Sequence, residues 1–235
     1  MKLMKQAVCI SEFDSSKFNL EEINAVAERH FQATCGLPAC SLAACDLVCS
    51  ERFRAVRARL APYIKPRALV RRFSREVVSE HGLHIEELSF PCSLRLEKEK
   101  ISTVYAFVLT IGELPEANLS IVDEFYSDLW GTACVGAVSD VLRARLGRIH
   151  GLESVSEPVS PGFYGMDVEK LADLFQIIDG SEIGVHLHGF TMSPLKSCAG
   201  FFIAAEQGRQ VSLSGHCLYC RKGNPESCRY CRLAR

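Results

Sequence analysis

The sequence predicts a fold that combines helices and strands around one substantial core. Residues 103–111 form a nearly continuous apolar run that ends at Gly112, which is typical of a central strand. Apolar residues recur at helical spacing in residues 19–33 and 115–146. A chain of 235 residues with 48% hydrophobic content is long enough to bury such a core. Nothing in the composition indicates disorder.

The first elements are a short strand and a capped helix. The strand is predicted at residues 7–13, and the helix begins at the N-cap residue Asn19, has Glu22 three positions later and closes at Gly36. A segment of small residues follows and carries four thiols. These are Cys35, Cys40, Cys45 and Cys49. They are either inert buried side chains or ligands of a metal cluster.

Residues 51–75 are strongly basic. They contain Arg52, Arg54, Arg57, Arg59, Lys65, Arg67, Arg71, Arg72 and Arg75. Two interpretations are open: a solvated helical face, or a surface that docks an acidic partner protein. Nucleic acid is not an expected partner, because the net charge is -1, few aromatic residues lie between the basic ones, and no nucleic-acid-binding motif is present.

The middle of the chain supplies the sheet and a long helix. Pro91 introduces a sheet region in which residues 94–97 alternate, and the strand at 103–111 is expected to be central. Pro115 is a plausible helix start. The helix is predicted to run to Leu146, with a break at Trp130-Gly131.

Residues 157–204 form a unit of loop, helix, strand, loop and strand. A Pro161-Gly162 turn opens the unit, and Gly165 leaves room for a ligand to approach the backbone. Asp167 is the expected N-cap of a helix that ends at Asp179-Gly180. Strands are predicted at residues 183–187 and 200–205, with a Ser193-Pro194 turn between them.

Four pieces of this unit, SPGFYG, LFQIID, IGV and MSPLKSCAG, occur in an order that resembles the reactivation domain of cobalamin-dependent methionine synthase, especially its short stand-alone versions. The strand ending in Thr-Ile-Gly and the helix after it extend the resemblance back to about Ser102. The resemblance implies an α+β fold, with a mixed, mostly antiparallel sheet flanked by helices. We expect this domain to span residues 1–210.

In the family that the chain resembles, an oxidised cobalamin is reduced by one electron and then methylated by S-adenosylmethionine, which the domain holds over the corrin. The resemblance therefore implies a cobalamin-binding methyltransferase or corrinoid protein as partner, and an electron-transfer protein as a second one. It also implies ligand contacts at Pro161, Gly162, Phe163 and Phe202.

The chain departs from the family at several ligand-facing positions. The arginine that clamps the methionyl carboxylate falls on Pro158, with Glu157 beside it, and a proline cannot replace a bidentate cation. Phe163 and Phe202 stand where the family has tyrosines. His188-Gly189 replaces a Thr-Glu-Ser triplet. These differences predict that binding of S-adenosylmethionine is weakened or lost.

Two histidines lie two residues apart on the strand predicted before the Ser193-Pro194 turn. His186 and His188 would therefore point to the same face. As a functional pair they could contact the cobalt or the corrin edge of a partner's cofactor. The alternative is a pair that faces solvent or a neighbouring strand.

Residues 211–235 form a cysteine-rich tail with two C-x2-C pairs. Cys217 and Cys220 form the first pair, and Cys228 and Cys231 the second. Basic residues around the pairs lower the pKa of thiols and offset the charge of four thiolates. The set suits tetrahedral zinc or a 4Fe-4S cluster. A tail without metal is the alternative.

Two functions follow from these features. The first is an accessory protein that supports reductive reactivation of a corrinoid methyltransferase. The alternative is a non-catalytic protein-binding module, stapled by a metal at the tail. With no apolar run of membrane-spanning length and no leader sequence, we expect a soluble, cytoplasmic protein.

Overall fold

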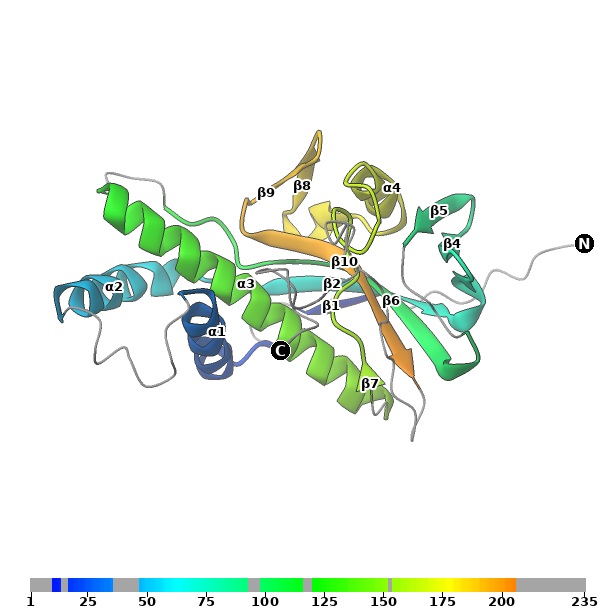
Figure 1. Cartoon of the computed structure of the whole chain (residues 1–235), viewed down its shortest axis with the longest axis horizontal. Helices are drawn as coiled ribbons and strands as arrows, with labels where there is room; N and C mark the ends of the chain where they lie inside the picture. The colour runs from blue at the N-terminus through cyan, green and yellow to red at the C-terminus, as the bar shows by residue number, and fades with distance from the viewer. Residues whose placement is uncertain are drawn as a thin grey trace, which may run out of the picture.

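A five-stranded antiparallel sheet forms the centre of the molecule (Figure 1). The computed structural model describes residues 10–13, 17–35, 47–92, 98–115, 120–151 and 154–205. In sheet order, the strands are β1 (Ile10–Phe13), β2 (Arg67–Ser74), β6 (Ile101–Thr110), β10 (Ser197–Ala205) and β7 (Ser154–Val155). Every neighbouring pair is antiparallel. The predicted α+β class and the central position of the strand at 103–111 are confirmed.

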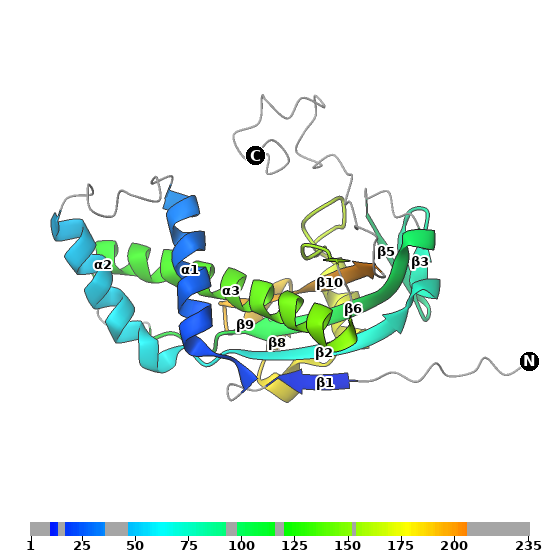
Figure 2. The same ribbon diagram turned by 90° about the horizontal axis from the view of Figure 1, so that it is seen from below.

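Three helices cover one face of this sheet (Figure 2). They are α1 (Leu20–Cys35), α2 (Leu47–Leu60) and α3 (Ile121–His150), and a short 3-10 turn, η3 (Ala61–Tyr63), follows α2. Alternate residues of β6, Tyr105, Phe107 and Leu109, are buried against these helices, as the period of a strand requires. We call this side the helix face.

A second core lies on the opposite face, which we call the loop face. There the intervening β6 residues, Val104, Ala106 and Val108, meet the remaining elements. These are η4 (Arg75–Val77), β3 (Val78–Ser79), β4 (Gly82–Ile85), β5 (Leu88–Pro91), α4 (Lys170–Ile177), η6 (Gly180–Ile183), β8 (His186–His188) and β9 (Thr191–Ser193). The short turn η5 (Lys98–Lys100) precedes β6 and has no buried residue. Because β6 and β10 are buried on both faces, their sequences are apolar at nearly every position.

The start of the first helix follows its prediction closely. The Asn19 side chain accepts hydrogen bonds from the backbone N–H groups of Glu21 at 2.9 Å and Glu22 at 3.4 Å. These bonds satisfy donors that the first turn of a helix leaves open. The predicted stop at Gly36 lies outside the described residues.

The predicted break at Trp130-Gly131 is wrong, because α3 runs without interruption for 30 residues. It also begins later than Pro115, at the N-cap Ser120, whose side chain accepts from the N–H of Asp123. A Cβ on Gly131 would lie 2.9 Å from the Leu114 side chain and 3.0 Å from that of Lys196. The glycine allows a close approach between elements and does not end the helix.

The basic stretch 51–75 is not one helical face, since α2 ends at Leu60 and the chain continues as β2. Several of its charges are also paired within the protein. Arg52 contacts Asp123 at 2.7 Å, Arg57 contacts Glu28 at 2.5 Å, and Arg71 contacts Glu86 at 3.0 Å. Fewer basic side chains of this stretch are therefore unpaired and available to an acidic partner than the sequence suggested.

Two local predictions in the C-terminal half are also wrong. The N-cap of α4 is Glu169, and Asp167 contributes only its backbone carbonyl, which accepts from the N–H of Lys170 at 3.0 Å. The strand predicted at 183–187 begins only at His186, because Ile183 ends η6 and Gly184 adopts a left-handed φ of 73°. No described helix is long and apolar enough to cross a membrane.

Candidate functional site

The segment 160–166, which we call the 160–166 loop, leaves the outer edge of β10. Val159 forms an isolated bridge with Phe201, and both of its N–H···O bonds measure 2.8 Å. The loop then folds back on itself through bonds from Gly162 N–H to Met166 O at 2.8 Å and from Phe163 N–H to Ser160 O at 2.9 Å. Its backbone is therefore fixed at one end by the sheet and internally by turns.

Three residues of the loop have left-handed backbone angles. Gly162 has φ 88°, Tyr164 has φ 51°, and Gly165 has φ 83°. A Cβ on Gly162 would meet nothing within 4 Å, so backbone conformation and not space accounts for glycine there. Tyr164 is strained by about 1 kcal/mol or more, and such strain is concentrated at ligand-binding loops.

The loop approaches β10 most closely at Gly200, the last residue of the MSPLKSCAG piece. A Cβ there would lie 2.4 Å from Ser160 Oγ and 2.7 Å from the carbonyl oxygen of Val159. Burial raises the pKa of the neighbouring Cys198 thiol to about 11, although a hydrogen bond from Ser160 partly offsets this. The thiol is protonated at neutral pH and is not a nucleophile.

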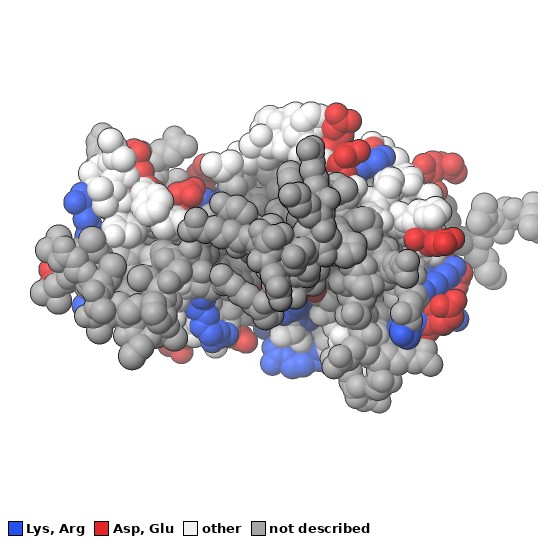
Figure 3. Space-filling model, in the orientation of Figure 1, with Lys and Arg blue, Asp and Glu red and all other residues white. Residues whose placement is uncertain are grey.

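The hairpin β8–β9 lies on the same side of the sheet as α4, and β9 contacts β10 (Figure 1). Residues 186–193 contain no Lys, Arg, Asp or Glu, and Figure 3 shows this tip as an uncharged surface. Phe190 in the hairpin is 53% exposed, and Leu195 just after it is 70% exposed. The hairpin therefore presents apolar groups and histidines to solvent.

His186 and His188 are both exposed and share one face of β8, whereas Leu187 between them packs against the loop-face core. The pKa of Asp179 is lowered mainly by hydrogen bonds from Ser181, and the charge of His186 contributes. His186 therefore lies near an ionised carboxylate.

The structure places three of the predicted site residues together in the 160–166 loop and separates Phe202 from them. Pro161, Gly162 and Phe163 lie in the 160–166 loop, where Phe163 is 66% exposed. Phe202 is fully buried on the helix face, where its ring stacks on Phe107 with centroids 4.2 Å apart. The ring of Phe202 is therefore a core group, and it does not share a surface with the loop.

Sequence reasoning missed the contact between Ser160 and Gly200. The final glycine of MSPLKSCAG could have indicated a close backbone approach, since a glycine inside a strand often does. The segment facing it could not be identified from the sequence, because the two residues lie 40 positions apart.

The predicted metal ligands, Cys217, Cys220, Cys228 and Cys231, lie outside the described residues, as do Cys40 and Cys45. Within the described ranges, no group of three or more His, Cys, Asp or Glu side chains is arranged to hold a metal ion.

Comparison with known proteins identifies solved structures with a similar fold. No family model matches the chain, and no curated protein matches its sequence. The crystal structure of the MetH reactivation domain bound to AdoHcy is similar, with a TM-score of 0.53 and 13% identity. The match covers 90% of this chain and 82% of that one. The chain therefore has the fold of the MetH reactivation domain, as its four sequence pieces predicted.

Proposed function

We propose that this chain is a cytoplasmic accessory protein that docks on a cobalamin-carrying methyltransferase or corrinoid protein and supports the reductive reactivation of its cofactor. The observation that carries this proposal is the packing of two of the sequence pieces against each other at β10. The SPGFYG loop packs on the glycine of MSPLKSCAG, in a fold shared with the MetH reactivation domain.

The proposed contact surface consists of the 160–166 loop and the tip of the β8–β9 hairpin. Phe163 and Phe190 expose more than half of their surface, and neither segment contains Lys, Arg, Asp or Glu. A corrin ring is large, flat and mainly apolar, so exposed aromatic groups on a fixed backbone suit it. His186 and His188 would lie at the rim of this contact, as donors to polar groups at the corrin edge.

Binding to a corrinoid protein tests this surface directly. We expect Phe163→Ala and Phe190→Ser each to weaken the complex at least tenfold, because aromatic anchors dominate such interfaces. Phe125→Ala is the matched control, since Phe125 is 59% exposed on α3, on the helix face. A corrinoid protein encoded in the same genome would be titrated with and without its cobalamin. Equal affinity for the two forms, or no complex at about 100 μM, would reject the proposal.

S-adenosylmethionine is proposed to bind weakly at the 160–166 loop. AdoHcy occupies the MetH domain, but Pro158 cannot clamp a carboxylate, and Glu157 beside it repels one. Calorimetric titration of the parent should show no low-micromolar affinity. Pro158→Arg should tighten binding, while Pro158→Ala should not. Low-micromolar binding by the parent would contradict this expectation.

We further propose that the tail residues Cys217, Cys220, Cys228 and Cys231 bind zinc or a 4Fe-4S cluster. Four thiolates fit either group, since zinc takes four sulfurs at about 2.3 Å and the cluster takes one on each iron. A cluster would supply electron transfer, and zinc would supply a structural staple. Iron, zinc and labile sulfide would be measured in anaerobically purified protein, with Cys217→Ser/Cys228→Ser as the control. Less than about 0.2 equivalents of either metal would remove this part of the proposal.

A further inference from the structure

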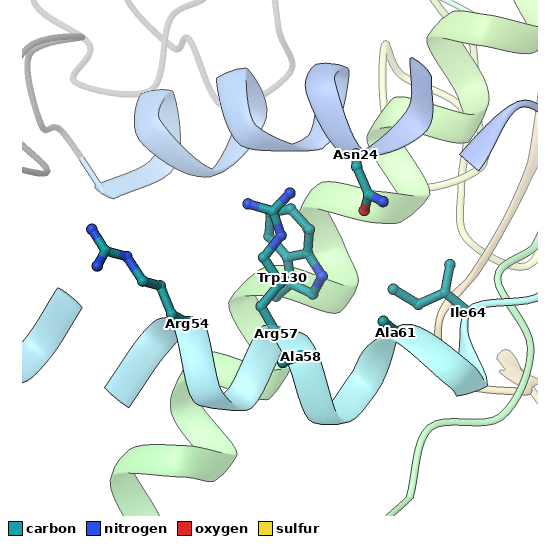
Figure 4. Close-up of a pocket in the computed structure, with 7 residues that line it drawn as sticks. All are labelled: Asn24, Arg54, Arg57, Ala58, Ala61, Ile64 and Trp130. Atoms are coloured by element: carbon teal, nitrogen blue, oxygen red, sulfur yellow. The ribbon is translucent and has the colours of Figure 1, made fainter. Parts of the chain in front are cut away.

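A pocket of about 310 Å³ lies between α1, α2 and α3, on the helix face and away from the 160–166 loop (Figure 4). Its lining includes Asn24 from α1, Arg54 and Arg57 from α2, Ala61 and Ile64 from the turn after α2, and Trp130 from α3. The pocket therefore combines hydrogen-bond donors with apolar groups.

The indole nitrogen of Trp130 is a buried donor in this pocket. The side chain is fully buried, and its Nε1–H has no hydrogen-bond partner in the described part of the protein. Figure 4 shows this nitrogen on the side of the ring that faces Asn24 and Ile64. A buried N–H of this kind normally has an acceptor, because leaving it unpaired costs free energy. The lining thus lacks an acceptor where a ligand atom could provide one.

Arg57 supplies a positioned cation beside that donor. Its guanidinium lies 4.5 Å from the centroid of the Trp130 ring, and its Nη1 donates to Glu28 at 2.5 Å. A guanidinium has five N–H donors, so the contact with Glu28 leaves others available. The aromatic ring on one side and the carboxylate on the other hold the group in place before any ligand binds.

The local charge selects the ligand further. Arg54 and Arg57 carry two positive charges, and Glu28 offsets one of them. A site with one residual positive charge suits a singly charged carboxylate better than a dianionic phosphate. Asn24 can donate through its amide, and Ala61 and Ile64 offer no polar group to an incoming ligand.

From these contacts we infer that the pocket binds a small organic acid, whose carboxylate accepts from Trp130 Nε1–H and the Arg57 side chain and whose apolar part lies against Ala61 and Ile64. Arg54 lines the same pocket and adds a positive charge that attracts the acid. The volume is at the lower end of the range for small-molecule sites, so the acid is compact. The inference does not rest on the proposed role with cobalamin, because no residue of the proposed docking surface lines this pocket.

The test uses the fact that the chain contains a single tryptophan. Its one indole N–H signal in a ¹H–¹⁵N spectrum of the full-length protein reports directly on the pocket. Benzoate is the probe, and benzyl alcohol is its uncharged counterpart. Benzoate should move the signal to lower field in a saturable way, because the proton becomes hydrogen-bonded, and benzyl alcohol should bind at least tenfold more weakly.

Two variants and a matched control separate local contacts from general charge effects. Arg54→Gln and Asn24→Leu should each weaken benzoate binding at least fivefold. Arg59→Gln removes the same charge from the same helix but does not line the pocket, so it should have little effect. If Asn24→Leu fails to fold, the comparison of Arg54→Gln with Arg59→Gln still decides the question.

Three results would overturn the inference. The first is an indole signal that does not move with benzoate up to about 20 mM. The second is an equal shift with benzyl alcohol, which would indicate an apolar cavity without carboxylate recognition. The third is equal weakening by Arg54→Gln and Arg59→Gln, which would indicate only a long-range effect of charge.

Discussion

The packing of the 160–166 loop on Gly200 gives the sharpest prediction. Replacing Gly200 by alanine would place a methyl group 2.4 Å from Ser160 Oγ and 2.7 Å from the carbonyl oxygen of Val159. The Ser160 hydroxyl can rotate away. The Val159 carbonyl cannot move freely, because it accepts from the N–H of Phe201 at 2.8 Å. The segment must therefore shift away from the sheet.

The expected cost of Gly200→Ala follows from two effects. Overpacking a tight site costs about 1–3 kcal/mol. Lengthening the two backbone hydrogen bonds between Val159 and Phe201 costs about 1 kcal/mol or less in addition for each, which is close to the net value of one hydrogen bond. We therefore expect the free energy of unfolding to fall by about 2–4 kcal/mol. The melting temperature should fall by roughly 5–15 °C for a chain of this size.

Urea unfolding followed by circular dichroism would measure this change, with Gly136→Ala as the matched control. A Cβ on Gly136, in the middle of α3, would meet only the His30 ring at 3.4 Å, which is an ordinary contact. Alanine is a better helix former than glycine, so this control should be neutral or up to about 1 kcal/mol more stable. If Gly200→Ala unfolds within about 0.5 kcal/mol of the parent, the close packing of the loop on β10 is refuted.

Three other predictions concern the core on the helix face and the contact between α1 and α3. Phe202→Ala should lower stability by about 3–5 kcal/mol in the same urea assay, because it empties a stacked core position; a small loss of stability would contradict its burial. Burial opposes ionisation of Asp140, but the hydrogen bond from His30 at 2.8 Å and the charge of Arg143 outweigh it, so the pKa of this carboxyl is lowered. The ionised Asp140 carboxylate therefore stabilises the folded protein at pH values above its ordinary pKa of about 4, and this stabilisation is lost as the pH falls through the pKa of the folded state. Asp140→Asn should make the free energy of unfolding depend less steeply on pH in acid, and it should cost under about 1 kcal/mol at pH 7. Burial raises the pKa of the Cys134 thiol to about 12, so iodoacetamide at pH 8 should label it only in urea; mass spectrometry of native protein that shows a labelled Cys134 would disprove this.

The sequence predicted the fold best where the local preference of a segment and its burial in the folded protein favour the same structure. Asn19 caps α1 because a short polar side chain at that point satisfies the first turn, whatever lies around it. The strand at 103–111 is apolar at consecutive positions because both faces are covered, and this pattern identified it as central. One error arose at a glycine. Gly131 was interpreted as a helix break, but it makes room for Leu114 and Lys196.

The candidate site was only partly predictable for a similar reason. The resemblance identified the 160–166 loop, since its glycines are needed for left-handed backbone angles. It also assigned Phe202 to the ligand, but strand alternation places that side chain on the face covered by helices. The pocket at Trp130 has no sequence signal, because its lining comes from three separate helical segments whose contacts arise only in the folded protein.

The position of β6 between β2 and β10 also affects how the chain is made. During synthesis β6 can pair with β2 at once, but its other partner, β10, emerges only about 90 residues later. At 5–20 residues per second, one edge of β6 therefore lacks its native partner for roughly 5–20 s. Its sequence, VYAFVLT, is uncharged and rich in β-branched and aromatic residues, which is the composition that promotes intermolecular strand pairing. Slower synthesis at low temperature lengthens this interval, so the yield of folded protein depends on protecting that edge until β10 arrives.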